Sequence, residues 1–360
     1  MIDGIIKGVK ISGIAAAVSN KWTSLETFID EENDEKTVRK FIKMTGVTGR
    51  YDAGIRQTTS DFCYVAAKEL LQKKDVLRDD IGLLVFVSQT PDYGLPATAF
   101  VLQSRLGLSK NCIAFDVNLG CSGFTYGLNI VSSIMKTNSI KKALLLCGDT
   151  SAKHRKPDVI KNTHSATMLF GDSGTATLLE RCEDQEIYTS SMSDGDGYNV
   201  IFEPYGRWRN PIAPKGIQLS TMDDLGVFQF STDRVPDLIN KTMIKLNTTP
   251  DDYDCLVLHQ ANLLILKQIA KKTGFSMDKT KISIDVFGNT SSSSIPITLV
   301  RHYGDEMNTS KIHALMCGYG VGLSWSVVDA YIDVEDVLPL IHTDEYYADG
   351  YYFEGGEKNE

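Results

Sequence analysis

The sequence has 360 residues, 42% of them hydrophobic and 23% charged, so it exceeds the usual size of one hydrophobic core and predicts two domains or two fused halves. This composition excludes a disordered chain, a collagen-like repeat and a coiled coil. The net charge is −9, but residues 331–360 hold nine acids and one lysine (−8), which leaves about −1 for the body, and no basic stripe interleaved with aromatics predicts a nucleic-acid partner.

The first 20 residues have neither the basic start nor the long apolar stretch of a secretory signal, and no window approaches 18 consecutive apolar residues. We therefore expect a cytoplasmic protein without a membrane partner. The seven cysteines are an odd number, show no CxxC pairing and mostly lie in apolar strands, so they indicate reduced thiols.

From residue 57 onward, amphipathic and purely apolar segments alternate. The pattern predicts helices over 58–74, 96–107 and 122–137, strands over 81–89, 111–118 and 141–149, and a hairpin over 167–180. Apolar strands bounded by amphipathic helices indicate a sheet that is covered on both faces.

The same order then returns. We predict helices over 233–247, 261–274 and 290–304 and strands over 254–260, 281–287, 311–320 and 321–332. Two copies of one α/β unit are therefore expected, with a first half over 1–185, a connection over 186–230, a second half over 231–332 and an acidic, Tyr-rich tail over 333–360. The Gly-, Pro- and aromatic-rich stretch 190–230 either shapes the mouth of the site or is a plain surface excursion, and the tail either packs on the body or stays disordered.

Laying the two copies over each other brings three polar residues to strand ends. Cys121 and Asn289 fall at equivalent places, each just before a helix, and His259 ends the strand equivalent to the one that carries Gln89. Ligands of α/β sheets collect at the carboxyl ends of the strands, so we expect these three residues to converge between the halves.

Cys121 lies where a strand runs through Gly120 directly into a helix. Such a position points amide groups at the sulfur, favours the thiolate, lowers the thiol pKa below its usual ~8.5 and supplies a donor for an oxyanion. The alternative is a small packed residue, with Gly120 and Gly123 serving close helix packing.

His259 and Asn289 each have two interpretations. A histidine at a strand end suits a general base or a hydrogen-bond donor, or it is structural. Asn289 is a functional carboxamide or a turn and cap residue. The GYGVGLSW segment (318–325) leads into a strand, whereas a dinucleotide loop precedes a helix, so we read it as a backbone turn that approaches the substrate. No metal-ligand spacing occurs, and we predict neither a metal site nor a cofactor.

The combination of motifs is specific. The segments DVNLGCSGF (116–124), GDSGTA (171–176), HQAN (259–262), FGNTSSSSIP (287–296) and GYGVGLSW occur in this order. Over residues 5–330 the chain resembles ketoacyl-ACP synthase III of the thiolase-like superfamily. The resemblance implies a thiolase-like fold of two pseudo-repeated halves with a layered αβαβα core, and an acyltransferase that works as a homodimer.

The resemblance also implies roles for individual residues. Cys121 takes an acyl group from a thioester, while His259 and Asn289 bind the carbonyl oxygen of a malonyl thioester during decarboxylative Claisen condensation. The amides of Cys121 and of the turn around Val321 hold the oxyanion. The expected substrate-binding residues are Gly320, Val321, Gly322, Leu95 and Asn262.

The acyl and malonyl thioesters are expected on acyl carrier protein or on coenzyme A. Relatives that use coenzyme A often carry Trp and two Arg where this sequence has Lys40, Met44 and His164, and an Arg where it has Leu264, which argues against coenzyme A as the acyl donor. On the helix after HQAN, three lysines form either a docking face for an acidic carrier or a solvated helix face. These are Lys267, Lys271 and Lys272.

Other activities stay open at this level. One is an acyltransferase of the same fold that passes the acyl group to a hydroxyl or amine without forming a carbon–carbon bond. Another is a Cys–His–Asn thioester hydrolase, and a third is a non-catalytic partner subunit.

Overall fold

The computed structural model describes residues 2–30, 34–151, 164–214, 220–306 and 309–351, and its strands form two copies of one pattern. In one half, β4 (Ile81–Val87) is parallel to β5 (Ile113–Val117) and β6 (Lys142–Asp149), and β6 is antiparallel to β7 (Ser173–Ser193). In the other, β10 (Cys255–Leu258) is parallel to β11 (Thr280–Lys281) and β12 (Lys311–Gly320), and β12 is antiparallel to β13 (Ser324–Asp333). The expected duplication is confirmed.

Two long strands join the halves. The start of β7 pairs with β6 and its end with β13, while β1 (Ile2–Val18) runs antiparallel along most of β7. The boundary expected at residue 185 therefore falls inside a strand, and 186–193 belong to the sheet. The prediction of a hairpin over 167–180 is wrong. The helix α5 (His164–Leu169) leads into the single strand β7, which pairs with β1 on one side and with β6 and β13 on the other.

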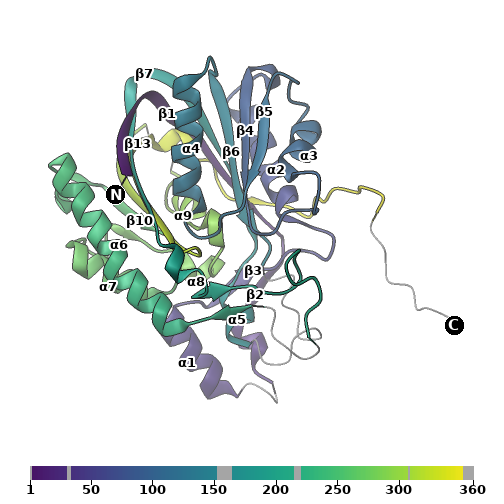
Figure 1. Cartoon of the computed structure of the whole chain (residues 1–360), viewed down its shortest axis with the longest axis vertical. Helices are drawn as coiled ribbons and strands as arrows, with labels where there is room; N and C mark the ends of the chain where they lie inside the picture. The colour runs from purple at the N-terminus through teal and green to yellow at the C-terminus, as the bar shows by residue number, and fades with distance from the viewer. Residues whose placement is uncertain (1, 31–33, 152–163, 215–219, 307–308, 352–360) are drawn as a thin grey trace.

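The helices form three layers (Figure 1). Helices α4 (Gly123–Thr137) and α9 (Ser294–Tyr303) lie between the halves, α2 (Thr59–Lys73) and α3 (Thr98–Leu106) cover the first half, and α6 (Asp224–Leu246) and α7 (Leu263–Thr273) cover the second. Smaller elements are α1 (Glu35–Thr45), β2 (Trp22–Ser24) and β3 (Gly49–Tyr51). None of the helices among the described residues is both long and apolar enough to cross a membrane.

Alternating side chains in the central strands create these layers. In β4, Leu83 and Val85 pack in the apolar cluster that contains α4 and α9, while Leu84 and Phe86 pack against α2 and α3. In β10 the same alternation divides the side chains between the central cluster and the one under α6 and α7. Since successive strand residues point to opposite faces, the result is the αβαβα core that the sequence predicts.

Two segments differ from the expected secondary structure. The strand expected over 281–287 is mostly a helical turn, α8 (Ile284–Phe287), because the Gln260 side-chain oxygen accepts the amides of Ser283 and Ile284 at 2.9 and 3.2 Å in place of a neighbouring strand. In the connection, β8 (Ile201–Phe202) pairs with β9 (Thr221–Met222), and α6 already begins at Asp224.

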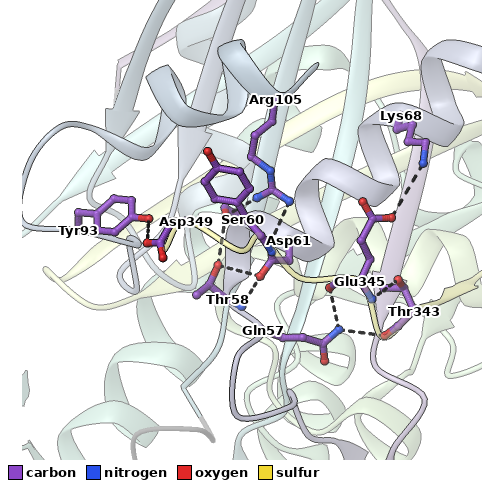
Figure 2. Close-up of polar contacts among 11 residues, drawn as sticks. Gln57, Thr58, Ser60, Asp61, Lys68, Tyr93, Arg105, Thr343, Glu345 and Asp349 are labelled. Carbon is purple, nitrogen blue, oxygen red and sulfur yellow. Dashed lines mark hydrogen bonds and ion pairs between the residues drawn. The ribbon is translucent and has the colours of Figure 1, made fainter. Parts of the chain in front are cut away.

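The C-terminal tail packs on the first half as far as it is described (Figure 2). Strand β14 (Ile341–His342) pairs in parallel with β1, and Gln57 then donates to the carbonyls of Thr343 and Glu345 at 3.0 and 3.1 Å. Further along, the Tyr347 amide donates to the Asp61 carboxylate at 2.8 Å. Residues 341–347 are thus held by backbone and side-chain contacts.

Candidate active site

Cys121 lies in a tight turn between β5 and α4. A Cβ atom on Gly120 would lie 2.1 Å from the Gln89 side-chain oxygen, and one on Gly320 would lie 2.5 Å from the Cys121 Cβ. Side chains at these positions would collide with their neighbours. Gly120 therefore lets the cysteine turn approach Gln89 closely, and Gly320 lets the 318–325 turn approach Cys121.

The Cys121 sulfur is a protonated thiol in this environment. Burial raises the pKa of Cys121 to about 12, the charge of Asp149 adds to the increase, and hydrogen bonds from the Cys121 and Val321 amides and the Ser291 hydroxyl offset it only in part. The expectation of a lowered pKa is therefore wrong, because desolvation by the surrounding protein outweighs the local effect of the helix start.

His259 ends β10 and is only 2% exposed. Its Nδ1 atom lies 2.7 Å from the Ser294 hydroxyl, and burial lowers the pKa of His259 to about 3, with a hydrogen bond to the Ser291 backbone opposing the change. The ring is thus neutral at physiological pH. In the tautomer in which Nδ1 accepts from the Ser294 hydroxyl, the ring hydrogen lies on Nε2, where it is available to donate.

Asn289 is fixed from two sides. Its backbone amide donates to the Leu169 carbonyl at 2.8 Å, and its own carbonyl accepts from Gly171 at 3.1 Å, so the turn is tied to the first half. Its side-chain oxygen accepts the Ser291 amide at 2.9 Å. The carboxamide nitrogen is the end that is left to donate.

Ser291 brings these three residues together. Its hydroxyl faces the Cys121 sulfur, its backbone faces the His259 ring, and its amide holds Asn289. Ser291 has a φ of 54°, which is uncommon for a residue other than glycine. The predicted convergence of Cys121, His259 and Asn289 is therefore present in the structure, although Asn289 follows the helical turn α8 and not a strand.

Asp149, at the end of β6, connects the surroundings of this site and is 1% exposed. One carboxylate oxygen accepts from the Ser88 hydroxyl, the Gln89 amide and the Thr90 hydroxyl at 3.1, 2.7 and 3.2 Å. The other accepts from the Ser292 amide and hydroxyl at 3.3 and 3.1 Å. The sequence interpretation missed Asp149 and Ser291; a strand-end acid and the run of serines after Asn289 were the available signals.

The other expected substrate-binding residues lie in different places. Gly320, Val321 and Gly322 form the turn against Cys121. Asn262 caps α7, with its side-chain oxygen accepting the Ile265 amide at 2.8 Å.

Leu95 lines a cavity of about 540 Å³ on the first half, which the tail closes on one side. The described residues that line it are Tyr93, Leu95, Pro96, Phe100, Val101, Ser104, Tyr347, Asp349 and Tyr351. None of them belongs to the turns that carry Cys121, His259 or Asn289. Leu95 is therefore part of a separate hollow in this chain.

The three lysines of α7 are not equivalent. Lys272 donates to the Thr232 carbonyl at 2.7 Å and pairs with Asp233 at 2.9 Å, so it links α7 to α6. Lys267 and Lys271 are exposed and form no ion pair with any described residue. Across the described part of the chain, no group of three His, Cys, Asp or Glu side chains is placed to hold a metal ion.

Comparison with known proteins assigns the family. A family model described as 3-oxoacyl-[acyl-carrier-protein (ACP)] synthase III matches residues 115–195, and its C-terminal counterpart matches 243–329. The beta-ketoacyl-[acyl-carrier-protein] synthase III of Caldanaerobacter subterraneus subsp. tengcongensis is 30% identical over 309 residues, which cover 84% of this chain and 90% of that protein. The chain belongs to the beta-ketoacyl-ACP synthase III family.

Other relatives of this synthase agree. The Clostridioides difficile protein of the same name is 30% identical over 78% of this chain and 86% of its own length. The crystal structure of a 3-oxoacyl-(acyl-carrier protein) synthase from Burkholderia xenovorans LB400 superposes with a TM-score of 0.89 at 34% identity, covering 95% of this chain and 99% of that one. The fold is thus thiolase-like, and the protein is a condensing acyltransferase; simple transfer and hydrolysis are not favoured.

Proposed function

We propose that this synthase carries its acyl group on Cys121 and condenses it with a malonyl thioester that His259 and Asn289 hold. The observation that carries the proposal is the meeting of three distant turns at Ser291, with two backbone amides directed at one sulfur. A neutral imidazole and a carboxamide nitrogen then supply two donors for one oxygen.

Acyl transfer to the thiol needs no cofactor. The Cys121 sulfur attacks the carbonyl carbon of the acyl thioester, and the tetrahedral oxyanion accepts hydrogen bonds from the amides of Cys121 and Val321. The carbon–sulfur bond to the carrier then breaks. The thiol proton of Cys121 ends on the departing thiol, and the acyl group stays activated as a thioester.

Condensation follows when a malonyl thioester enters. Its carboxylate leaves as carbon dioxide, and the enolate oxygen that forms accepts from the His259 imidazole and the Asn289 carboxamide. The carbanion attacks the acyl carbon on Cys121, the carbon–sulfur bond breaks, and the sulfur regains a proton from solvent. The products are a β-ketoacyl thioester and carbon dioxide.

We propose acyl carrier protein as the bearer of the thioesters. Lys267 and Lys271 present two exposed positive charges on α7, which begins four residues after His259, and an acidic carrier would be attracted to them. The absence of the Trp and Arg residues expected for coenzyme A supports the same choice.

The connection that follows Ser193 contributes to the entrance of the active site. Its first residue, Asp194, exchanges two backbone hydrogen bonds with Leu323 of the 318–325 turn, at 2.8 and 2.9 Å.

A homodimer built on the first half fits the exposed residues there. Strand β5 ends the strand order of the sheet, and Ile113 on it is 49% exposed. Leu95 and Phe100 nearby in sequence are 79% and 50% exposed. Light scattering of the purified protein measures the assembly state.

The proposed location is the cytoplasm. The seven cysteines form no disulfide bonds, which suits that reducing compartment.

Intact-mass analysis tests the function directly. The protein is incubated with a panel of acyl-carrier and acyl-coenzyme A thioesters, and Cys121→Ala is the control. We expect an acyl adduct on the wild type and none on the variant. Adding malonyl carrier protein should release carbon dioxide and discharge the adduct. An adduct that survives the substitution, or discharge without carbon dioxide, would overturn the proposal.

A further inference from the structure

We propose that Asp149 is a positioning residue of the condensation reaction: its carboxylate holds the Cys121 side and the Asn289 side of the site in one fixed relation, and its charge faces the Cys121 sulfur. The inference rests on the proposed role of Cys121. It assigns a function to a buried acid that neither binds substrate nor belongs to the three expected catalytic residues.

The two oxygens of Asp149 serve different halves of the protein. One accepts three hydrogen bonds from residues 88–90, where β4 ends in the first half. The other accepts two from Ser292 in the second half. Two of these five donors are backbone amides, which cannot act as acceptors, so the bonds favour the ionised carboxylate and oppose the increase in the pKa of Asp149 that burial causes.

Each set of bonds reaches a reacting group through one further contact. On the first side, the Gln89 side chain packs on Gly120, where even a Cβ would lie 2.1 Å from its oxygen, and Gly120 precedes Cys121. On the second side, Ser292 follows Ser291, whose amide holds the Asn289 carboxamide at 2.9 Å. Because a shift of ~1 Å in a reacting group can cost about 10²-fold in rate, loosening this link should slow condensation.

The charge of Asp149 acts on the thiol in the opposite sense. Burial is the larger cause of the raised pKa of Cys121, and the charge of Asp149 is the second. Tyr319, whose pKa burial raises, also interacts with Cys121, and the His259 ring beside Tyr319 is neutral because burial lowers its pKa. Removing the charge of Asp149 should therefore raise the alkylation rate of the Cys121 thiol while the condensation rate falls. If Asp149 had only a structural role, its removal would not change these two rates in opposite directions.

The test is Asp149→Asn in the full chain. The carboxamide keeps one oxygen for residues 88–90, but its NH₂ group faces the Ser292 amide, so two donors oppose each other. We expect condensation to fall about 10²-fold and the alkylation of Cys121 by iodoacetamide at pH 8 to rise several-fold. Asp116→Asn is the matched control, since this carboxylate also lies on a strand of the first half and accepts two amides, from Thr98 and Ala99, both at 2.7 Å. Asp116→Asn should change neither the condensation rate nor the alkylation rate of Cys121.

A second variant keeps the test decisive if Asp149→Asn does not fold. Ser292→Ala removes the hydroxyl that contacts both the carboxylate and the Val87 carbonyl and leaves the charge of Asp149, so condensation should fall while alkylation stays at the wild-type rate. The proposal is overturned if condensation is unchanged in both variants, or if alkylation slows along with condensation in a folded Asp149→Asn protein. Failure of the proposed function is a separate result, because it appears as a wild-type protein whose Cys121 takes no acyl group although iodoacetamide still alkylates it.

Discussion

Ser292 donates its backbone amide and its hydroxyl to one oxygen of Asp149, although 143 residues separate the two in sequence. The bond crosses the boundary between the two copies of the α/β unit. In the proposed mechanism each copy supplies different chemistry: the nucleophile comes from the first, and the two donors for the malonyl oxygen come from the second. The site is therefore complete only when the copies are docked, and buried polar contacts of this kind fix the docking.

The pKa of Cys121 predicts how the free thiol reacts. With a pKa of about 12, little thiolate exists at neutral pH, and the alkylation rate should rise about tenfold per pH unit between pH 7 and 10. Peptide mass spectrometry after iodoacetamide treatment measures the rate at Cys121 apart from that at Cys182, which is also partly exposed. A plateau reached between pH 7 and 9 would contradict the expectation.

His259 and Asn289 should matter for the second step and not for the first. Replacing either by Ala removes one donor to the enolate, which typically costs about 10²–10³-fold, so carbon dioxide release should fall by that factor while Cys121 is still acylated. Since burial lowers the pKa of His259 to about 3, the ring is neutral above that pH and adds no limb to the pH profile between 5 and 8. His302→Gln, in the same half, is the control.

Local patterns were enough to predict much of this site. The pattern of β5 marks a strand, and the small residues after it place Cys121 in a strand-to-helix turn. The apolar run of β10 likewise places His259 at a strand end. Asn289 instead lies in the turn between the helices α8 and α9, which the sequence pattern did not predict. The duplication then gives the relative positions of those turns. Geometry that follows from strand ends and helix starts is therefore readable in the sequence.

Features that depend on distant partners were not readable. The helical turn α8 forms because the Gln260 side chain captures two amides, and β7 crosses from one half to the other because partners exist on both sides. The raised pKa of Cys121 has the same origin, since the desolvating atoms come from both halves. The role of Asp149 depends on a partner 143 residues away.

Charge reversal on α7 should weaken the encounter with an acidic carrier. For Lys267→Glu combined with Lys271→Glu, we expect the KM for carrier-bound thioester to rise roughly tenfold, most strongly at low salt, because the positive charges steer association. The KM for a short pantetheine thioester should not change. Lys73→Glu combined with Lys141→Glu, two exposed positions of the first half, changes the net charge by the same amount and is the control. Equal changes for both substrates would contradict carrier docking at these lysines.

The tail should contribute measurably to stability through Arg105 (Figure 2). This side chain pairs with Asp61 at 2.9 Å, with 7% and 1% of the two side chains exposed, and its guanidinium lies 4.7 Å from the Tyr347 ring centre. Removing one partner of a buried ion pair costs about 3–5 kcal/mol, so Arg105→Ala should lower the free energy of unfolding in urea by that amount. Arg39→Ala is the matched control, because Arg39 forms an exposed ion pair with Glu35.

A chain that ends after His342 tests whether the tail shares in this energy. It lacks the Tyr347 ring and the Tyr347 amide bond to Asp61. Arg105→Ala should therefore cost less in the shortened chain than in the full one. Equal costs in both would mean that the tail is not coupled to Arg105.

His313, at the start of β12, should make stability depend on pH. Burial alone would lower its pKa, but the hydrogen bond and charge of Asp329, with the Asp252 carbonyl and the charge of Asp254, raise it above the usual value. A raised folded-state pKa stabilises the fold fully below the unfolded value near ~6.5, and this contribution is lost as the pH rises through the folded pKa. His313→Gln should therefore cost about 1.5–3 kcal/mol at pH 5.5 and distinctly less at pH 9, as measured by urea unfolding. A cost that is the same at both pH values would show that the charge of His313 adds nothing to stability.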